Sequence, residues 1–232
     1  MKIAVINGQN HKGTTYHIGK MLADKLAGEV TEFFLPRDFS SFCVGCNNCF
    51  MKGEKLCQHY KALEPITKAM DEADVIILTS PVYVYHATGA MKAFLDHYGY
   101  RWMVHRPNGK MFTKQAVCIS TAAGAGMKYT NKDMADSLFF WGVPKIYKLG
   151  YGVRAISYSE VSEKILAKID RDTSALANKI KANCGSVKPN IKIRGFFEIM
   201  RMMNKGKGMN SADNEYWRAN GWTEKVRPWR ST

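Results

Sequence analysis

Long apolar runs are absent from the 232-residue sequence, and none approaches the roughly 20 residues that a membrane-spanning helix needs. We also expect no signal peptide, because residues 1–6 pass directly into a strand-like run without an apolar stretch and a small-residue cleavage site. We find no internal repeat. We therefore expect a cytoplasmic protein without a membrane span, in a reducing compartment where thiols stay available as ligands.

Acidic residues are scarce, with 20 Asp and Glu against 34 Lys and Arg, which gives a net charge of +14. Such a charge is typical of proteins that bind nucleic acid, anionic membranes or phosphorylated ligands. The positive charges are nevertheless spread along the chain, and no block of like charges occurs. We interpret them as a solvated surface and expect no nucleic-acid partner.

Apolar runs alternate with segments of helical periodicity along most of the sequence. Strands are predicted over 2–7, 29–35, 74–79, 115–121 and 144–151. Helices are predicted over 14–27, 61–73, 88–100, 127–141 and 159–183. This alternation predicts an α/β fold, in which a doubly wound parallel sheet with right-handed crossovers has the strand order 2-1-3-4-5 of flavodoxin-like proteins.

The pattern changes after residue 185, so we divide the chain into an α/β domain over 1–185 and a basic C-terminal extension over 186–232. The extension is rich in Met and holds three of the five tryptophans. One of its helical faces is apolar, which favours docking onto the body or onto a second subunit; a basic amphipathic helix on a membrane is the alternative. The residues of that face are Phe196, Ile199, Met200 and Met203.

Ligands of open parallel sheets bind outside the carboxyl ends of the strands, so the loops after the first four strands share one neighbourhood. The first of these loops, 7–15, is polar, glycine-punctuated and followed by a helix. Free N–H groups at a helix start, with the hydroxyls of Thr14 and Thr15 and the charge of Lys12, suit a phosphate. A capped helix start is the alternative. The loop has neither P-loop nor G-x-G-x-x-G spacing.

The loops after the third and fourth strands differ in character. Pro81 ends the third strand, and the rings of Tyr83 and Tyr85 would frame a flat heterocycle, with hydrophobic packing as the alternative. The fourth loop, 120–126, consists of small residues, which let a backbone approach a ligand closely but also suit a plain turn.

Four cysteines lie within fifteen residues, in the run Cys43-Val-Gly-Cys46-Asn-Asn-Cys49 followed by Cys57. A C-x2-C-x2-C run lets one tight loop offer three thiolates, and a fourth from nearby completes the ligands of a [4Fe-4S] cluster. A zinc site that includes His59 and a metal-free set of reduced thiols are the alternatives. We expect structural or incidental roles for the other two cysteines, Cys118 and Cys184.

Together, these features resemble the NAD(P)H-dependent FMN reductase group of the flavodoxin-like superfamily. The resemblance rests on the first loop ending Gly13-Thr14-Thr15, the cysteine run, and the segment that begins Ser80-Pro81-Val82-Tyr83 and continues into 91–96. Within that group the chain is most similar to the iron-sulfur flavoproteins, over about residues 1–185.

The resemblance implies that the first loop holds the FMN phosphate and that the third and fourth loops hold the isoalloxazine ring. His11 and Lys12 would add positive charge beside the phosphate. The residues to which the resemblance assigns FMN contacts are Gln9, His11, Lys12, Gly13, Thr14, Thr15, Pro81, Val82, Tyr83, Val84, Tyr85, Thr121, Ala122, Ala123 and Gly124. The metal ligands would be Cys43, Cys46, Cys49 and Cys57.

The predicted function is that of an FMN-dependent NAD(P)H oxidoreductase, with the cluster near the flavin at the carboxyl end of the second strand. The alternatives are an electron carrier or redox sensor without turnover, and a metal-free FMN reductase with free thiols. We expect a nicotinamide or an electron-carrier protein as partner and a homo-oligomer, a dimer or a tetramer. We assign no catalytic side chain, because the cofactor supplies the reactive atom. For His86 and His97 we favour surface or helix-face positions.

Overall fold

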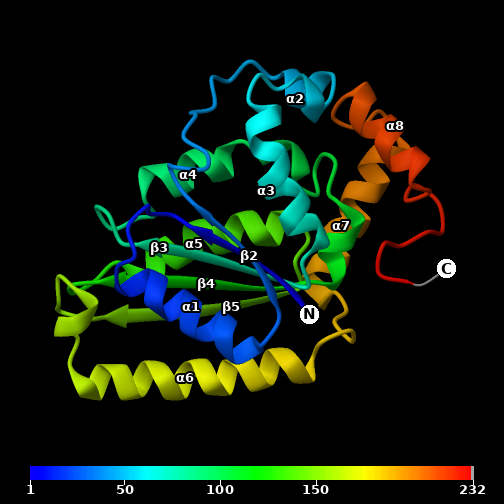
Figure 1. The fold of residues 1–232 in the computed structure, drawn as a ribbon. Coiled ribbons are helices and arrows are strands. Elements are labelled where there is room, and N and C mark those ends of the chain that lie inside the picture. Colours follow the sequence, from blue (N-terminus) through cyan, green and yellow to red (C-terminus); the bar gives the residue numbers. More distant parts are fainter. Residues whose placement is uncertain (231–232) are drawn as a thin grey trace.

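The computed structural model describes residues 1–230 and contains a five-stranded parallel sheet of order β2-β1-β3-β4-β5 (Figure 1). The predicted strand order is therefore confirmed. The strands are β1 (Lys2–Asn7), β2 (Glu29–Phe34), β3 (Val75–Pro81), β4 (Gln115–Ala122) and β5 (Lys145–Gly152). The helices are α1 (Thr14–Leu26), α2 (Asn48–Met51), α3 (Tyr60–Glu72), α4 (Gly89–Asp96), α5 (Met127–Phe140), α6 (Glu163–Ala182), α7 (Ile191–Lys205) and α8 (Ser211–Ala219).

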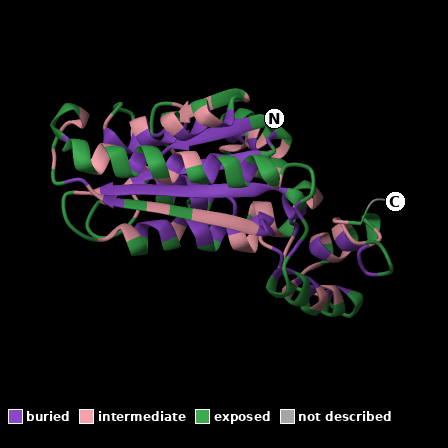
Figure 2. Ribbon diagram, turned by 90° about the horizontal axis from the view of Figure 1, so that it is seen from below, coloured by how far each residue is buried: buried purple, intermediate pink, exposed green. Residues whose placement is uncertain are grey.

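Helices cover both faces of the sheet, and alternate residues of each strand point to opposite sides. In β1, Ile3 and Val5 pack with α1 and α6, whereas Ala4 and Ile6 pack with α3, α4 and α5. Figure 2 shows the central strands as a buried layer between two layers of half-exposed helices. Burial on both sides explains why the central strands are continuous apolar runs.

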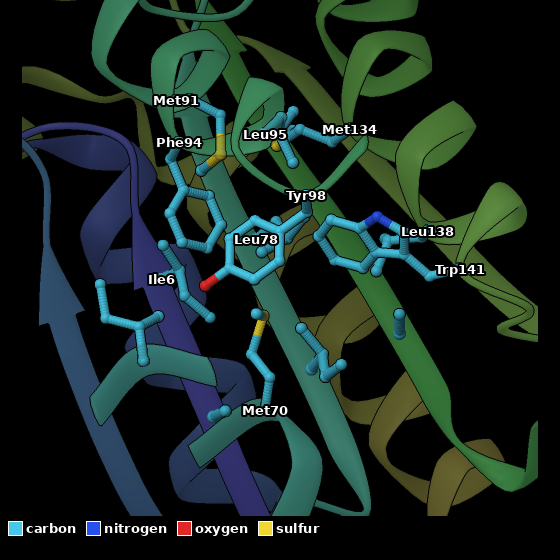
Figure 3. Close-up of a cluster of buried hydrophobic side chains, with 14 of the residues drawn as sticks. Ile6, Met70, Leu78, Met91, Phe94, Leu95, Tyr98, Met134, Leu138 and Trp141 are labelled. Carbon is cyan, nitrogen blue, oxygen red and sulfur yellow. The ribbon is translucent and has the colours of Figure 1, made fainter. Parts of the chain in front are cut away.

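The second of these cores is built around aromatic side chains (Figure 3). Tyr98 and Trp141 are both buried, with ring centroids 5.4 Å apart. The hydroxyl of Tyr98 lies 2.8 Å from that of Thr67 on α3, so its polar atom is satisfied. This core holds α4 firmly beneath the loops at the carboxyl ends of the strands.

Two predicted helices end differently in the structure. The helix predicted over 88–100 ends at Asp96, and a 3-10 turn, η2 (Gly99–Arg101), follows it. The helix predicted over 159–183 is preceded by a 3-10 turn, η4 (Tyr158–Glu160), with its own capping box, and α6 starts only at Glu163. The capping box of Ser157 and Glu160 belongs to η4, whereas Ser162 at the N-cap of α6 makes no side-chain cap hydrogen bond.

The C-terminal extension packs against residues 103–112 at the end of the sheet where the strands begin (Figure 1). The apolar face predicted for its first helix is only half correct, because Met200 is buried and Phe196 packs against the core of the extension. The buried residues of α7 are Ile193, Phe197, Met200 and Asn204, while Ile199 and Met203 are exposed. Phe197 forms the centre of this core, with Trp217 and Trp222 around it. None of the helices within residues 1–230 combines the length and apolar character needed to span a membrane.

Candidate active site and cysteine pocket

A cleft lies at the carboxyl ends of β1, β3, β4 and β5, and it brings together most of the loop residues singled out in the sequence. The predicted residues that line it are Gln9, His11, Gly13, Thr14, Thr15, Pro81, Val82, Tyr83, Thr121, Ala122 and Ala123. Lys12, Val84, Tyr85 and Gly124 lie outside the lining. Three loops far apart in the sequence thus form one site.

The first loop is held in place by β3 and the start of α4. The N–H of Gly8 donates to the carbonyl of Thr79 at 2.7 Å, and the hydroxyl of Thr88 donates to the carbonyl of Gly8 at 2.6 Å. Gly13 occupies the N-cap of α1 and offers no capping side chain. Thr14 and Thr15, buried in the first turn, border the cleft. First-turn N–H groups and two hydroxyls therefore converge where an anion would be stabilised.

The third loop is a tight hairpin. The backbones of Tyr83 and His86 pair in both directions at 3.0 Å, and the two residues between them, Val84 and Tyr85, have positive φ angles of 49° and 67°. Such a turn normally contains Asn or Gly, because a β-branched residue is strained there. Asp133 accepts from the His86 ring at 3.0 Å and fixes the base of the hairpin. The amide of Gln9 donates to the hydroxyl of Tyr83, which joins the hairpin to the first loop.

Part of the cleft wall consists of residues that were not predicted from the sequence. Asn7, Tyr16 and Thr79 line its floor, and the loop after β5 adds Val153, Ala155 and Ile156. Ligands of open parallel sheets bind outside the carboxyl ends of all their strands, including the fifth. That general rule could have indicated the loop after β5 from the sequence. The side chain of Ile156 is 99% exposed, which gives the cleft an apolar rim.

Two basic side chains, Lys12 and His17, lie near the end of the cleft that is formed by the first turn of α1. The ammonium of Lys12 lies 5.5 Å from the ring centre of Tyr16, which lines the cleft. Burial lowers the pKa of His17, which stacks on Tyr158 behind the loop. Lys12 is thus a basic side chain beside this wall of the cleft.

A second, smaller pocket is lined by all four clustered cysteines. Gly45 and Asn47 both have left-handed backbones, with φ of 66° and 59°, so the chain turns sharply between successive cysteines. Burial raises the pKa of the Cys49 thiol, and the charges of Cys57, Cys43 and Cys46 raise it further. Thiolates that repel one another at this range suit a shared cation, which would remove the repulsion.

Two histidines complete the cysteine pocket. The sulfur of Cys57 and ring nitrogens of His59 and His97 all lie within 4.8 Å of one another, and His59 Nδ1 is 2.9 Å from His97 Nε2. Burial lowers the pKa of His97, and its Nδ1 donates to the carbonyl of Ala93 at 2.7 Å. Nε2 then carries the lone pair toward His59. Of the surface or helix-face positions favoured for the two histidines, His86 has the exposed one, whereas His97 is buried at the C-terminal end of α4.

The cysteine pocket and the cleft lie at opposite ends of α4. Thr88 binds the first loop at the start of this helix, whereas Asp96 and His97 line the cysteine pocket at its end. The eight residues of α4 span roughly 12 Å at 1.5 Å per residue. Figure 1 shows the segment after β2 crossing over α4 toward α2, beside α8. The expected meeting of the cysteine loop with the phosphate loop does not occur within one chain.

A parallel sheet of order 2-1-3-4-5 with its cleft at the carboxyl strand ends defines a flavodoxin-like protein. The family model described as NADPH-dependent FMN reductase matches residues 1–153, and the chain belongs to this family. Its members are flavin-dependent oxidoreductases, for which FMN and a reduced nicotinamide are the expected cofactors.

Two known proteins with similar sequences are named iron-sulfur flavoproteins. An iron-sulfur flavoprotein of Archaeoglobus fulgidus is 28% identical over 202 residues, which cover 83% of this chain and 84% of that protein. An iron-sulfur flavoprotein of Clostridioides difficile is 34% identical over 183 residues, covering 74% and 76%.

A solved structure supports the fold alone. The FMN-dependent NADH-azoreductase of Bacillus anthracis, in complex with FMN, superimposes with a TM-score of 0.57 at 12% identity, covering 77% of this chain and 100% of that one.

Proposed function

We propose that the cleft binds FMN and that the protein oxidises NADH or NADPH through it. The observation that carries this proposal is the convergence of a polar helix start with two loops of small and aromatic residues at one sheet edge. When bound, FMN supplies a centre that accepts a hydride and releases electrons.

Different residues of the cleft would bind different parts of FMN. The first-turn N–H groups of α1, with the Thr14 and Thr15 hydroxyls, bind the phosphate. The small side chains of Ala122 and Ala123 let the flat ring approach the β4 loop, and Tyr83 borders it on the other side. The loop at 153–156 excludes water from one edge. No side chain needs to act as an acid or base.

The test is a titration of the purified protein with FMN, followed by NADH and NADPH oxidation. Thr15→Val removes a buried hydroxyl at the phosphate end, and we expect FMN affinity to fall by about tenfold or more. Thr31→Val, at an exposed position of β2, is the matched control and should bind FMN normally. A protein that takes up no FMN would contradict the proposal. FMN uptake without nicotinamide oxidation would favour an electron carrier or redox sensor.

We also propose that Cys43, Cys46, Cys49 and Cys57 hold a [4Fe-4S] cluster. Support comes from the four thiols around one pocket and from the names of the relatives. Anaerobically purified protein should contain iron and acid-labile sulfide, and Cys46→Ser should lose both. Cys184→Ser, which changes an exposed cysteine outside the pocket, should keep both.

A mononuclear metal ion at Cys57, His59 and His97 is a second candidate, because these three side chains already converge. Zinc without sulfide, lost in His97→Asn and retained in Cys46→Ser, would favour it. Protein free of both metals, with four reactive thiols, would instead leave an FMN reductase whose cysteines are free.

A homo-oligomer, dimer or tetramer, would serve the proposed electron transfer. Because α4 separates the two pockets within a chain, a neighbouring subunit could bring its cysteine pocket closer to the cleft. Sedimentation equilibrium tests this part, and a monomer at all concentrations would contradict it.

A further inference from the structure

The short helix that carries Cys49 depends on a side chain from outside its own loop. α2 is four residues long, far below the roughly 12 residues that a helix needs to be stable alone. Its carbonyls at Cys49 and Phe50 accept hydrogen bonds from the guanidinium of Arg106, with 3.0 Å between Nη1 and the Phe50 oxygen. Arg106 therefore supplies donors to carbonyls that a one-turn helix leaves open.

Arg106 is itself oriented by the C-terminal extension. Its side chain is buried, and its Nη1 also donates to the carboxylate of Asp213 on α8. Asp213 is fully buried and accepts two more hydrogen bonds, from His105 Nδ1 at 2.7 Å and from Asn210 Nδ2 at 2.8 Å. A buried carboxylate is stable only with such partners, and the pair fixes the plane of the guanidinium.

Further contacts hold α8 rigidly on the same segment. The indole of Trp217 donates to the carbonyl of His105 at 2.5 Å, and the hydroxyl of Tyr216 donates to the carbonyl of Pro107 at 2.7 Å. The ring of Phe50 lies against the ring of His105, with centroids 4.7 Å apart. Figure 1 shows α2 and α8 side by side, although about 160 residues separate them in the sequence.

We propose that the C-terminal extension acts as a clamp on the cysteine loop, and that Asp213, acting through Arg106, positions Cys49 to ligate the cluster. This inference rests on the proposed metal centre. Both residues are positioning residues, because they reach the backbone of the cysteine loop and not its thiols. The family match ends at residue 153, so the clamp comes from a part of the chain that lies beyond it.

The decisive variant is Asp213→Asn in the full-length protein. The amide keeps the shape of the side chain but leaves the buried charge of Arg106 without its counter-charge. We expect hydrogen exchange of the amides at 47–53 to accelerate by about tenfold, because the loop opens more often. Iron and sulfide per FMN should fall by at least about half, and the EPR signal of the remaining cluster should change. FMN content should stay at the wild-type level.

The matched control is Glu198→Gln, in the same extension. Glu198 pairs with Arg201 and Arg227 and not with Arg106, so this variant removes an ion pair of the extension but leaves the Asp213–Arg106 pair intact. It should keep wild-type exchange at 47–53 and wild-type iron. Arg106→Lys retains the charge but not the two-pronged donor geometry, and should resemble Asp213→Asn in exchange.

Two results would overturn the inference: unchanged exchange and iron content in Asp213→Asn, or equal acceleration at 47–53 in Glu198→Gln. Wild-type protein without iron would instead contradict the proposed metal centre. In that case the exchange comparison still decides whether Asp213 and Arg106 hold the loop, so the two failures are distinguishable.

Discussion

The hydroxyl of Thr15, at the start of α1, lies 2.5 Å from the hydroxyl of Thr121, at the end of β4. Both side chains are buried, and 106 positions separate them in the sequence. This hydrogen bond joins the loop proposed to bind phosphate to the loop proposed to approach the flavin ring. Because Thr15 and Thr121 both line the cleft, this hydrogen bond fixes the two loops relative to each other.

The first prediction concerns this contact. A double-mutant cycle of Thr15→Val and Thr121→Val should give a coupling energy of about 1 kcal/mol in the free energy of unfolding, because each single variant strands a buried hydroxyl. Urea denaturation of the flavin-free protein measures it. Strictly additive effects would show that the two hydroxyls do not support each other.

The fold was predictable because its signals are local and repeated. The run from Val75 to Thr79 is apolar at nearly every position, as a strand buried on both faces requires, and the five alternations leave few possible topologies. The positions of the loops at 7–15 and 120–126 were predictable for a related reason. In a parallel sheet, every loop that follows a strand begins at the same edge of the sheet.

The remaining features depend on tertiary contacts. His97 belongs to the cysteine pocket because α4 ends after Asp96, and an end of a helix is poorly fixed by its own sequence. The face of α7 was misjudged because both of its sides carry apolar residues, and only docking against Trp217 decides which side is buried. The path of the cysteine loop depends on Arg106, whose partner lies in the extension.

A second prediction follows from the hairpin at the mouth of the cleft. Val84 has a φ of 49° and a side chain that is 95% exposed, so it accepts backbone strain without gaining burial. Val84→Asn should raise the free energy of unfolding by about 1 kcal/mol, since Asn tolerates this conformation. Val30→Asn, in the exposed part of β2, should lower it instead. A destabilised Val84→Asn would mean that the valine makes a contact worth more than the strain.

A third prediction concerns pH. Burial lowers the pKa of Lys114 to about 8, and its ammonium donates to the carbonyls of Asp71 and Ala73. The unfolded chain keeps an ordinary lysine pKa, so between about pH 8 and 10.5 the unfolded state binds more protons than the folded state. Stability from this group therefore rises with pH across that window, by about 2 to 3 kcal/mol. Below pH 8, the folded protein bears the full loss of stability that comes from burying the charged Lys114 ammonium.

The variant Lys114→Met has no group that titrates at this position, so it is the reference against which the wild type is compared. The difference in unfolding free energy between the wild type and Lys114→Met should grow in favour of the wild type from pH 8 to pH 10.5. Denaturation series at several pH values measure it. A constant difference would show that Lys114 titrates as an ordinary surface lysine.

A fourth prediction separates the six cysteines by reactivity. Burial raises the pKa of Cys118 to about 12, so in the folded protein this thiol should resist alkylation, whereas Cys43, Cys46 and Cys184 are exposed and should react first. Loading with iron and sulfide should protect Cys43 and Cys46, because a thiolate bound to iron is no longer a free nucleophile. Cys184 should stay reactive in both states, which makes it the internal control. Mass spectrometry after timed treatment with iodoacetamide reads out every site, and equal labelling of Cys43 with and without iron would place the metal elsewhere.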